Sequence, residues 1–244
     1  MLTGKPFLHR GQDTLSLHFD LLATQSQMRL DAPIELQLPY TRTMMGFVLF
    51  HPRPARIAMI GLGGGSMVKY CHEHLPRSFM EVAEISAQVI ALREQFGIPP
   101  DSERLRVRCV DGADFVRDSD AQFDVLLVDG FDRLGQSPQL CSSTFYANCR
   151  QRLAPGGLMV VNMARPDPLR LHRIDRIRDQ FSTVVVVESD DFCSQIVFAF
   201  PAGTVCTPVE RLLDCLGPLE HAHPVDLRRT LFKIRREQLL NLLD

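Results

Sequence analysis

The chain has 244 residues, 45% of them apolar, and carries a formal net charge of -2. This length suffices for one substantial hydrophobic core with a small appendage, and it is too short for two full α/β domains. Because charges of both signs are mixed along the chain, neither a phosphate-tracking surface nor a polybasic patch stands out, and we expect no nucleic-acid partner and no membrane partner.

Cysteine usage and the first residues bear on the cellular compartment. The seven cysteines are odd in number and scattered without a CxxC pair, which favours reduced thiols over a disulfide or zinc framework, so we expect no metal. No apolar run approaches the ~20 residues of a membrane-spanning helix. The opening stretch, MLTGKPFLHRGQDTL, lacks the apolar segment of a secretory signal. We therefore predict a cytoplasmic protein.

Apolar and polar residues alternate in short bursts between residues 14 and 40, with the period of half-buried strands. Strands are expected around 15–19, 28–30 and 34–38. We group residues 1–40 as a small N-terminal β element.

The segment from Tyr40 to Phe50 is predicted to be a helix, because its large apolar residues fall on one side. The prolines at 52 and 54 end this helix. Residues 41–244 form the predicted main domain.

From residue 55 onward, apolar strands alternate with amphipathic helices, a pattern typical of a parallel sheet covered by helices on both faces. Only a short polar link joins the last two strands, so we expect them to form an antiparallel pair that closes the sheet. The predicted strands are Arg56–Ile60, Phe79–Ile85, Arg104–Val110, Phe123–Val128, Leu158–Asn162, Thr183–Val187 and Gln195–Phe200; the predicted helices are Ser86–Phe96, Ser143–Leu153, Leu169–Gln180, Pro208–Leu216 and Val225–Leu243.

A glycine-rich turn follows the first of these strands, at Gly61-Leu62-Gly63-Gly64-Gly65-Ser66. Such a turn lets the backbone approach a ligand closely and presents a helix N-terminus to it. Alone it does not separate a nicotinamide, flavin or adenosylmethionine site from a plain strand-to-helix turn. Glu84 strengthens the case, because an acid at the end of the next strand can accept both hydroxyls of a ribose.

Two further acids end the next strands: Asp111, followed by Gly112, and Asp129. Open α/β sheets bind ligands at the carboxyl ends of their strands. An Asp beside a Gly suits an adenine amino group, because the carboxylate accepts from it and the glycine leaves room for the ring. Dehydrogenases do not need this second pair of acids. The ordered set therefore favours an adenosylmethionine-type ligand and a class I methyltransferase-like Rossmann sheet.

The sequence resembles the spermidine synthase (polyamine aminopropyltransferase) family, from Tyr40 to about Phe200. The family's glycine loop is similar to Gly61–Ser66, its Glu-Ile-Asp to Glu84-Ile85-Ser86, and its Gly-Asp-Gly to Val110-Asp111-Gly112. Its Asp-Ser-Ser-Asp-Pro loop is similar to Asp129-Gly130-Phe131-Asp132-Arg133. The Gly, Leu-Phe and Phe-Tyr that follow this loop are similar to Gly135, Leu140 and Phe145-Tyr146.

By this resemblance each acid has a distinct role. Glu84 would hold the ribose, Asp111 the adenine, Asp129 the reacting amine, and Asp132 the positive charge of the substrate. The remaining matches are Tyr40, at the family tyrosine that hydrogen-bonds the attacking nitrogen; Gln25, at a nucleoside-contacting Gln-Ser; and the loop glycines Gly61, Gly63 and Gly65.

The chemistry agrees with these roles. Transfer of a group from a sulfonium to an amine needs a neutral nucleophile, yet alkyl amines have pKa values near that of Lys, ~10.4. A carboxylate at the amine can position it and accept its proton. Asp129 is the candidate, although a structural Asp that caps the loop after the strand is the alternative.

Several positions depart from the family pattern. Gly64 stands where the family has an acid that favours the decarboxylated donor, so we expect weaker discrimination against ordinary adenosylmethionine. Arg42, Arg133 and Asp191 replace a family glutamate, proline and substrate tyrosine, and Gln25 lies only fifteen residues before Tyr40, about half the usual distance. The polyamine pocket is thus expected to be partly rebuilt.

The leading hypothesis is a transferase that moves an aminopropyl group from decarboxylated S-adenosylmethionine to an amine such as a polyamine. A methyltransferase that uses ordinary S-adenosylmethionine on a small molecule, and a non-catalytic nucleoside-binding relative, are the alternatives. The apolar residues of the final helix lie at helical spacing, and we favour their packing in the core over their forming a homodimer interface. A homodimer stays an alternative. We expect no ligand role for His72, His74, His221 or His223, the last two being solvated.

Overall fold

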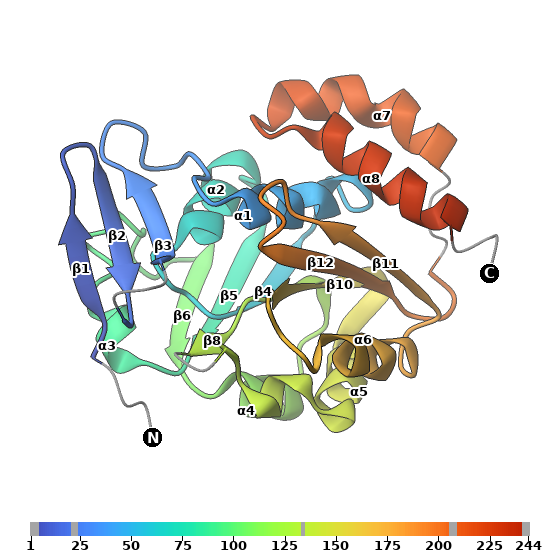
Figure 1. The fold of residues 1–244 in the computed structure, drawn as a ribbon, viewed down its shortest axis with the longest axis horizontal. Helices are drawn as coiled ribbons and strands as arrows, with labels where there is room; N and C mark the ends of the chain where they lie inside the picture. Colours follow the sequence, from blue (N-terminus) through green and yellow to red (C-terminus); the bar gives the residue numbers. More distant parts are fainter. Residues whose placement is uncertain (1–4, 21–23, 133–134, 205–208, 241–244) are drawn as a thin grey trace.

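The computed structural model describes residues 5–20, 24–132, 135–204 and 209–240. The chain begins with a three-stranded antiparallel sheet in the order β1-β2-β3, seen at the left of Figure 1. Its strands are β1 (Phe7–Arg10), β2 (Thr14–His18) and β3 (Thr24–Arg29). Leu15, Leu17 and Met28 point inward and join the core of the main sheet.

The predicted strand at 34–38 is wrong, and the first strand, at Phe7–Arg10, was not predicted. In segment 34–38 the carbonyls of Leu36 and Gln37 accept hydrogen bonds from the Arg42 guanidinium instead of a neighbouring strand. Their backbone acceptors are therefore satisfied without a sheet ladder. Phe7–Arg10 is largely exposed, so its sequence carries little apolar alternation.

The predicted helix over 40–50 is confirmed, in two parts. It consists of α1 (Pro39–Met44) and a 3₁₀ helix, η1 (Met45–Leu49). Pro39 suits the first helical turn because its missing N–H would have no helical partner there. Met44, Met45, Phe47 and Val48, on its apolar side, are fully buried.

The central sheet has seven strands in the order β11-β12-β10-β7-β4-β5-β6, which confirms the predicted α/β class. Pairs among the first five strands along the chain are parallel, and β12 lies antiparallel between β10 and β11. The antiparallel pairing of β11 with β12 confirms the prediction for the last two strands. The strands are β4 (Arg56–Ile60), β5 (Phe79–Glu84), β6 (Leu105–Cys109), β7 (Phe123–Val128), β10 (Leu153–Ala164), β11 (Thr183–Glu188) and β12 (Ser194–Phe200).

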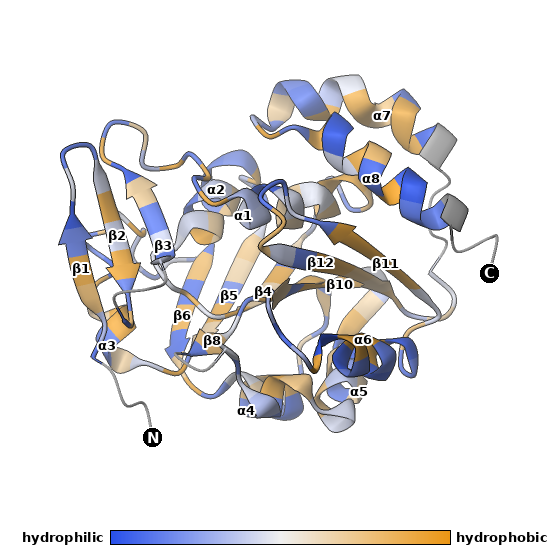
Figure 2. Ribbon diagram, viewed as in Figure 1, coloured by the Kyte–Doolittle hydropathy of each residue, from blue (hydrophilic) through white to orange (hydrophobic). Residues whose placement is uncertain are grey.

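Helices cover both faces of this sheet (Figure 1). One group lies below it in that view, and the other lies above it together with α1 and η1. The lower group is α4 (Gly112–Asp118), α5 (Ser143–Gln151) and α6 (Arg170–Arg178); the upper one includes α2 (Ser66–His74), α7 (Val209–Ala222) and α8 (Leu227–Leu240). Each face has its own cluster of buried apolar residues, and Figure 2 shows the strands between them as largely hydrophobic.

Three short elements complete the fold: α3 (Ala87–Ile90), the hairpin of β8 (Phe131–Asp132) with β9 (Gly135–Gln136), and η2 (Pro138–Cys141). The helix predicted over 86–96 is mostly wrong, because only its first turn is α-helical. Beyond it, the N–H groups of Leu92, Arg93 and Gln95 bond three residues back, and the chain turns at Gly97 with φ +63°. Such tight turns replace the regular helix.

Of the two C-terminal helices, α7 continues to Ala222, beyond its predicted end at Leu216, and α8 begins at Leu227, two residues after its predicted start. Leu227, Leu231 and Ile234 are buried, which confirms the core interpretation of the last helix. The expectation that His223 is solvated is wrong: it is 2% exposed, and its Nδ1 lies 3.2 Å from the Tyr70 hydroxyl. Over the described ranges, none of the helices has both the length and the apolar character needed to cross a membrane.

Candidate active site

A cavity opens at the carboxyl ends of the parallel strands, between the central sheet, the N-terminal sheet and α1. Segments far apart in the sequence supply its walls. It brings together nine of the ten site residues predicted from the sequence, which are Gln25, Tyr40, Gly61, Gly63, Glu84, Asp111, Gly112, Asp129 and Asp132.

The tenth residue, Gly65, shapes the loop without lining the cavity. It precedes α2 at the N-cap position with φ +65°, and a Cβ there would run into the Ile98 side chain. Gly61, at φ +92°, lies so close to Asp129 that a Cβ would collide with the Asp129 carbonyl. These two glycines are therefore required by backbone conformation and close approach.

Glu84 ends β5 and is 8% exposed. One carboxylate oxygen accepts a hydrogen bond from the Leu62 N–H and the other from the Ser86 N–H, each at 2.8 Å. Burial raises the pKa of Glu84, against the lowering effect of these backbone donors. The carboxylate thus holds the glycine loop and also lines the cavity.

Asp111 is the N-cap of α4, where its Oδ1 accepts hydrogen bonds from the backbone N–H groups of Ala113 (2.7 Å) and Asp114 (3.3 Å). This structural role coexists with its place in the cavity wall. Gly112 packs against Ile60, since a Cβ would collide with that side chain. Asp111 is therefore fixed in orientation by capping before any ligand binds.

Asp129 follows β7 and accepts two side-chain hydrogen bonds. The Tyr40 hydroxyl donates to Oδ2 over 3.1 Å, and the Asn162 amide donates to Oδ1 over 2.8 Å. Burial raises the pKa of Asp129 to about 7, although both hydrogen bonds act to lower it. The side chain is thus oriented from both sides and exchanges its proton near neutral pH, which suits a general base.

Asn162 is a site residue that the sequence analysis missed, because it was read only as the end of a strand. Its signal is positional: β10 runs parallel to β7, and Val161 pairs with Val128, so the next residues along each strand lie side by side. A polar residue in a strand that is otherwise buried and apolar could have revealed it.

Asp132 lies on β8, opposite Gly135 of β9, and also faces the cavity. Arg133, which replaces a family proline, lies outside the described residues. Gln25 reaches the cavity from β3, beside Ser26, whose hydroxyl lies 3.4 Å from that of Ser66. The N-terminal sheet therefore closes one side of the site despite its short spacing to Tyr40.

The position of Gly64 is sterically closed. A Cβ at Gly64 would lie 2.6 Å from Ser26 Oγ and 2.9 Å from the Phe96 ring, so any side chain requires these neighbours to shift. The missing acid is thus linked to how closely the N-terminal sheet and the glycine loop pack here.

Two other departures from the family pattern have structural roles outside the cavity. Arg42 Nη1 donates to the carbonyls of Leu36 (2.7 Å) and Gln37 (2.9 Å). Asp191 lies in the turn between β11 and β12, where its Oδ1 accepts from the Ser189 hydroxyl (2.6 Å) and the Cys193 N–H (3.1 Å). Neither residue contributes to the cavity wall.

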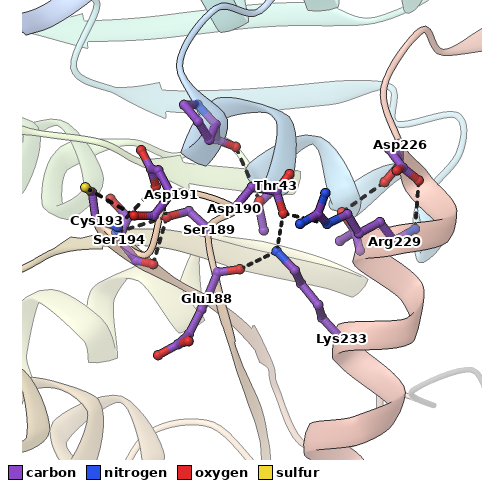
Figure 3. A network of polar contacts seen from close by, with 12 residues as sticks. Thr43, Glu188, Ser189, Asp190, Asp191, Cys193, Ser194, Asp226, Arg229 and Lys233 are labelled. Atoms are coloured by element: carbon purple, nitrogen blue, oxygen red, sulfur yellow. Dashed lines mark hydrogen bonds and ion pairs between the residues drawn. The ribbon is translucent and has the colours of Figure 1, made fainter.

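The same turn is tied to α8, as Figure 3 shows. Asp190 Oδ1 pairs with Lys233 Nζ at 2.6 Å and with Arg229 Nε at 2.9 Å. Lys233 Nζ also donates to the Glu188 carbonyl over 2.7 Å. This network anchors the C-terminal helix to the antiparallel end of the sheet.

Within the described part of the chain, no group of His, Cys, Asp and Glu side chains is arranged to hold a metal ion.

Comparison with known proteins agrees with this geometry. The family model described as "Spermine/spermidine synthase domain" matches residues 37–205. The polyamine aminopropyltransferase of Chromobacterium violaceum is 37% identical over 172 residues, which cover 70% of this chain and 66% of that protein. The polyamine aminopropyltransferase of Neisseria meningitidis serogroup A is 33% identical over 219 residues, 88% of this chain and 83% of that protein.

Among solved structures, a probable spermidine synthase from Corynebacterium glutamicum superposes with a TM-score of 0.70 at 22% identity, covering 87% of this chain and 84% of the other. At that identity the likeness concerns the fold alone. The family match and the sequence relatives carry the assignment further: the chain belongs to the spermine/spermidine synthase family.

Proposed function

We propose that this chain is an aminopropyltransferase, which binds decarboxylated S-adenosylmethionine and transfers its aminopropyl group to an aliphatic amine. The proposal is supported by the family assignment and by the names of its relatives. It is supported further by the charges that surround the cavity.

Acidic side chains line the cavity, and this charge is the main support for the proposal. Glu84, Asp111, Asp129 and Asp132 face it, while the described residues that line it include no Lys, Arg or His. A decarboxylated donor and an amine acceptor bring only positive charge into this space. The carboxylate of ordinary adenosylmethionine would add a negative charge; two like charges ~5 Å apart repel by about 3 kcal/mol at an effective dielectric near 20.

The nucleoside half of the donor matches the residues on the glycine-loop side. Glu84 lines the cavity and would accept hydrogen bonds from the ribose hydroxyls with its carboxylate oxygens. Asp111 would accept one from the adenine amino group with the oxygen that does not cap α4. Gln25 would contact the nucleoside from the N-terminal sheet.

Asp129 would act as the general base. The nitrogen lone pair of the acceptor attacks the aminopropyl carbon bound to the sulfonium sulfur. As the new C–N bond forms, the C–S bond breaks and its electrons go to sulfur, which leaves neutral methylthioadenosine. Asp129 takes the proton that the amine loses. Its raised pKa, about 7, makes this transfer less unfavourable than it would be for an ordinary carboxylate.

Asp132 would hold the second positive charge of a diamine. It lies three residues beyond Asp129 on the same loop and faces the same cavity. A carboxylate there attracts an ammonium group without needing to move a proton. The two acids thus divide the work between the reacting nitrogen and the distal one.

A pair of matched variants tests these roles. Asp129→Asn keeps the size of the side chain and should lower turnover by roughly 10²- to 10⁴-fold, while donor binding measured by calorimetry persists. Asp132→Asn should mainly raise the KM for a diamine. An Asp129→Asn protein that turns over at the wild-type rate would contradict the proposal.

A further inference from the structure

The Asn162 side chain is an unexplained polar group beneath the proposed base. It is 4% exposed, and its Nδ2 donates to Asp129 Oδ1 over 2.8 Å. Its own Oδ1 is buried and has no hydrogen-bond partner among the described residues. A buried acceptor without a partner costs free energy, so its persistence calls for a functional reason.

We propose that Asn162 is a positioning residue, which holds the Asp129 carboxylate toward the acceptor amine both before and after the proton moves. This inference rests on the proposed function for its kinetic consequence, whereas the contact itself is independent of it.

The amide has the chemistry that this role requires. A carboxylate needs a donor, and the Asn162 NH₂ supplies one at Oδ1. Once Asp129 carries the proton, it becomes a donor itself and needs an acceptor. Rotation of the Asn162 amide by half a turn presents the unpartnered Oδ1 to that new O–H. One neutral side chain can therefore satisfy both protonation states, and it never competes for the proton.

Tyr40 contacts the other carboxylate oxygen of Asp129, so it does not replace Asn162 at Oδ1. From α1, Tyr40 donates to Oδ2, and burial together with the Asp129 charge raises its pKa well above the ordinary value. It therefore stays a phenol near neutral pH. The remaining titratable groups of the cavity are the acids Glu84, Asp111 and Asp132, which repel a carboxylate rather than hold it.

Titration of Asp129 by NMR with ¹³C-labelled aspartate tests the contact directly. Asn162→Leu removes the donor, and we expect the pKa of Asp129 to rise by about one to two units, as loss of a hydrogen bond to a charged group predicts. The acid limb of the pH–activity profile should then move to higher pH by the same amount. The control is Val161→Ala, which trims the adjacent buried residue of β10 and should leave the Asp129 titration unchanged.

Asn162→Asp, nearly the same size, covers the case in which the leucine variant does not fold. Two carboxylates within hydrogen-bond distance share a proton, so one of them should titrate well above wild type. Three results would overturn the positioning role: an unchanged Asp129 titration in folded Asn162→Leu, no carboxyl that titrates above the wild-type Asp129 in folded Asn162→Asp, or a shift of equal size in Val161→Ala. If the shift is seen but no aminopropyl transfer is found, the contact stands and the proposed function fails.

Discussion

The Glu84 carboxylate accepts a hydrogen bond from the backbone N–H of Leu62 at 2.8 Å, and so joins the end of β5 to the glycine loop after β4. A residue proposed to bind the ribose therefore also builds the loop against which the nucleoside would lie. Variants at Glu84 will change both, and the two effects must be separated.

Glu84→Gln should lower the affinity for methylthioadenosine by roughly ten- to a hundredfold, because a charge-assisted contact to the ribose is lost. Calorimetric titration measures this affinity. The 2′,3′-dideoxy analogue lacks the hydroxyls and separates the two effects, since it should bind wild type and variant much more equally. Should both ligands weaken by the same factor, Glu84 acts through the loop alone.

Substitution of Gly64 should lower both stability and donor binding for steric reasons. Because a Cβ at Gly64 would press on Ser26 and the Phe96 ring, we expect Gly64→Ala to lower the melting temperature and to weaken both donors. Gly64→Asn and Gly64→Asp should behave like the alanine variant, because the collision at the Cβ does not depend on charge. A selective loss of ordinary adenosylmethionine in Gly64→Asp, absent from Gly64→Asn, would show instead that a charge at this position discriminates between the donors.

Acid should destabilise the docking of the C-terminal helices through His223. Burial is the main cause that lowers the pKa of His223 from 6.5 to about 4, and the His74 charge adds to it. Between these values the unfolded chain binds the proton and the folded one does not, so stability falls as the pH drops from about 6.5 to about 4. The full shift corresponds to about 3 kcal/mol.

Urea unfolding at a series of pH values measures this dependence. His223→Gln should flatten the part of the curve between pH 6.5 and pH 4, whereas His221→Gln, at an exposed position of the same segment, should leave it unchanged. Equal slopes in wild type and His223→Gln would show that His223 is not the group responsible.

The sequence predicted most of the fold because its strongest signals are local. The apolar strands β4, β7 and β12 and the turns between them carry their own patterns, and the short link before β12 implied an antiparallel pair. The prediction of a strand at 34–38 was wrong because the alternation of apolar residues does not show which groups satisfy the backbone carbonyls. The Arg42 guanidinium, not a strand, satisfies two of its carbonyls.

The candidate site was predictable where residues lie at strand ends, as Glu84 does at the end of β5 and Asp129 does directly after β7. It was not predictable where the contact depends on register or on distant packing. Asn162 reaches Asp129 because β10 lies beside β7, and His223 is buried in contact with Tyr70 and His74 of α2. Neither pairing has a sequence motif, since the partners come from separate elements.

The central claim, aminopropyl transfer, is tested most directly by mass spectrometry of the products. Wild-type protein is incubated with 1,4-diaminobutane and an equimolar mixture of decarboxylated and ordinary adenosylmethionine. The acidic cavity predicts an aminopropylated diamine and methylthioadenosine in equal amounts, with the ordinary donor unconsumed. A methylated diamine with S-adenosylhomocysteine, or no product from either donor, would contradict the account.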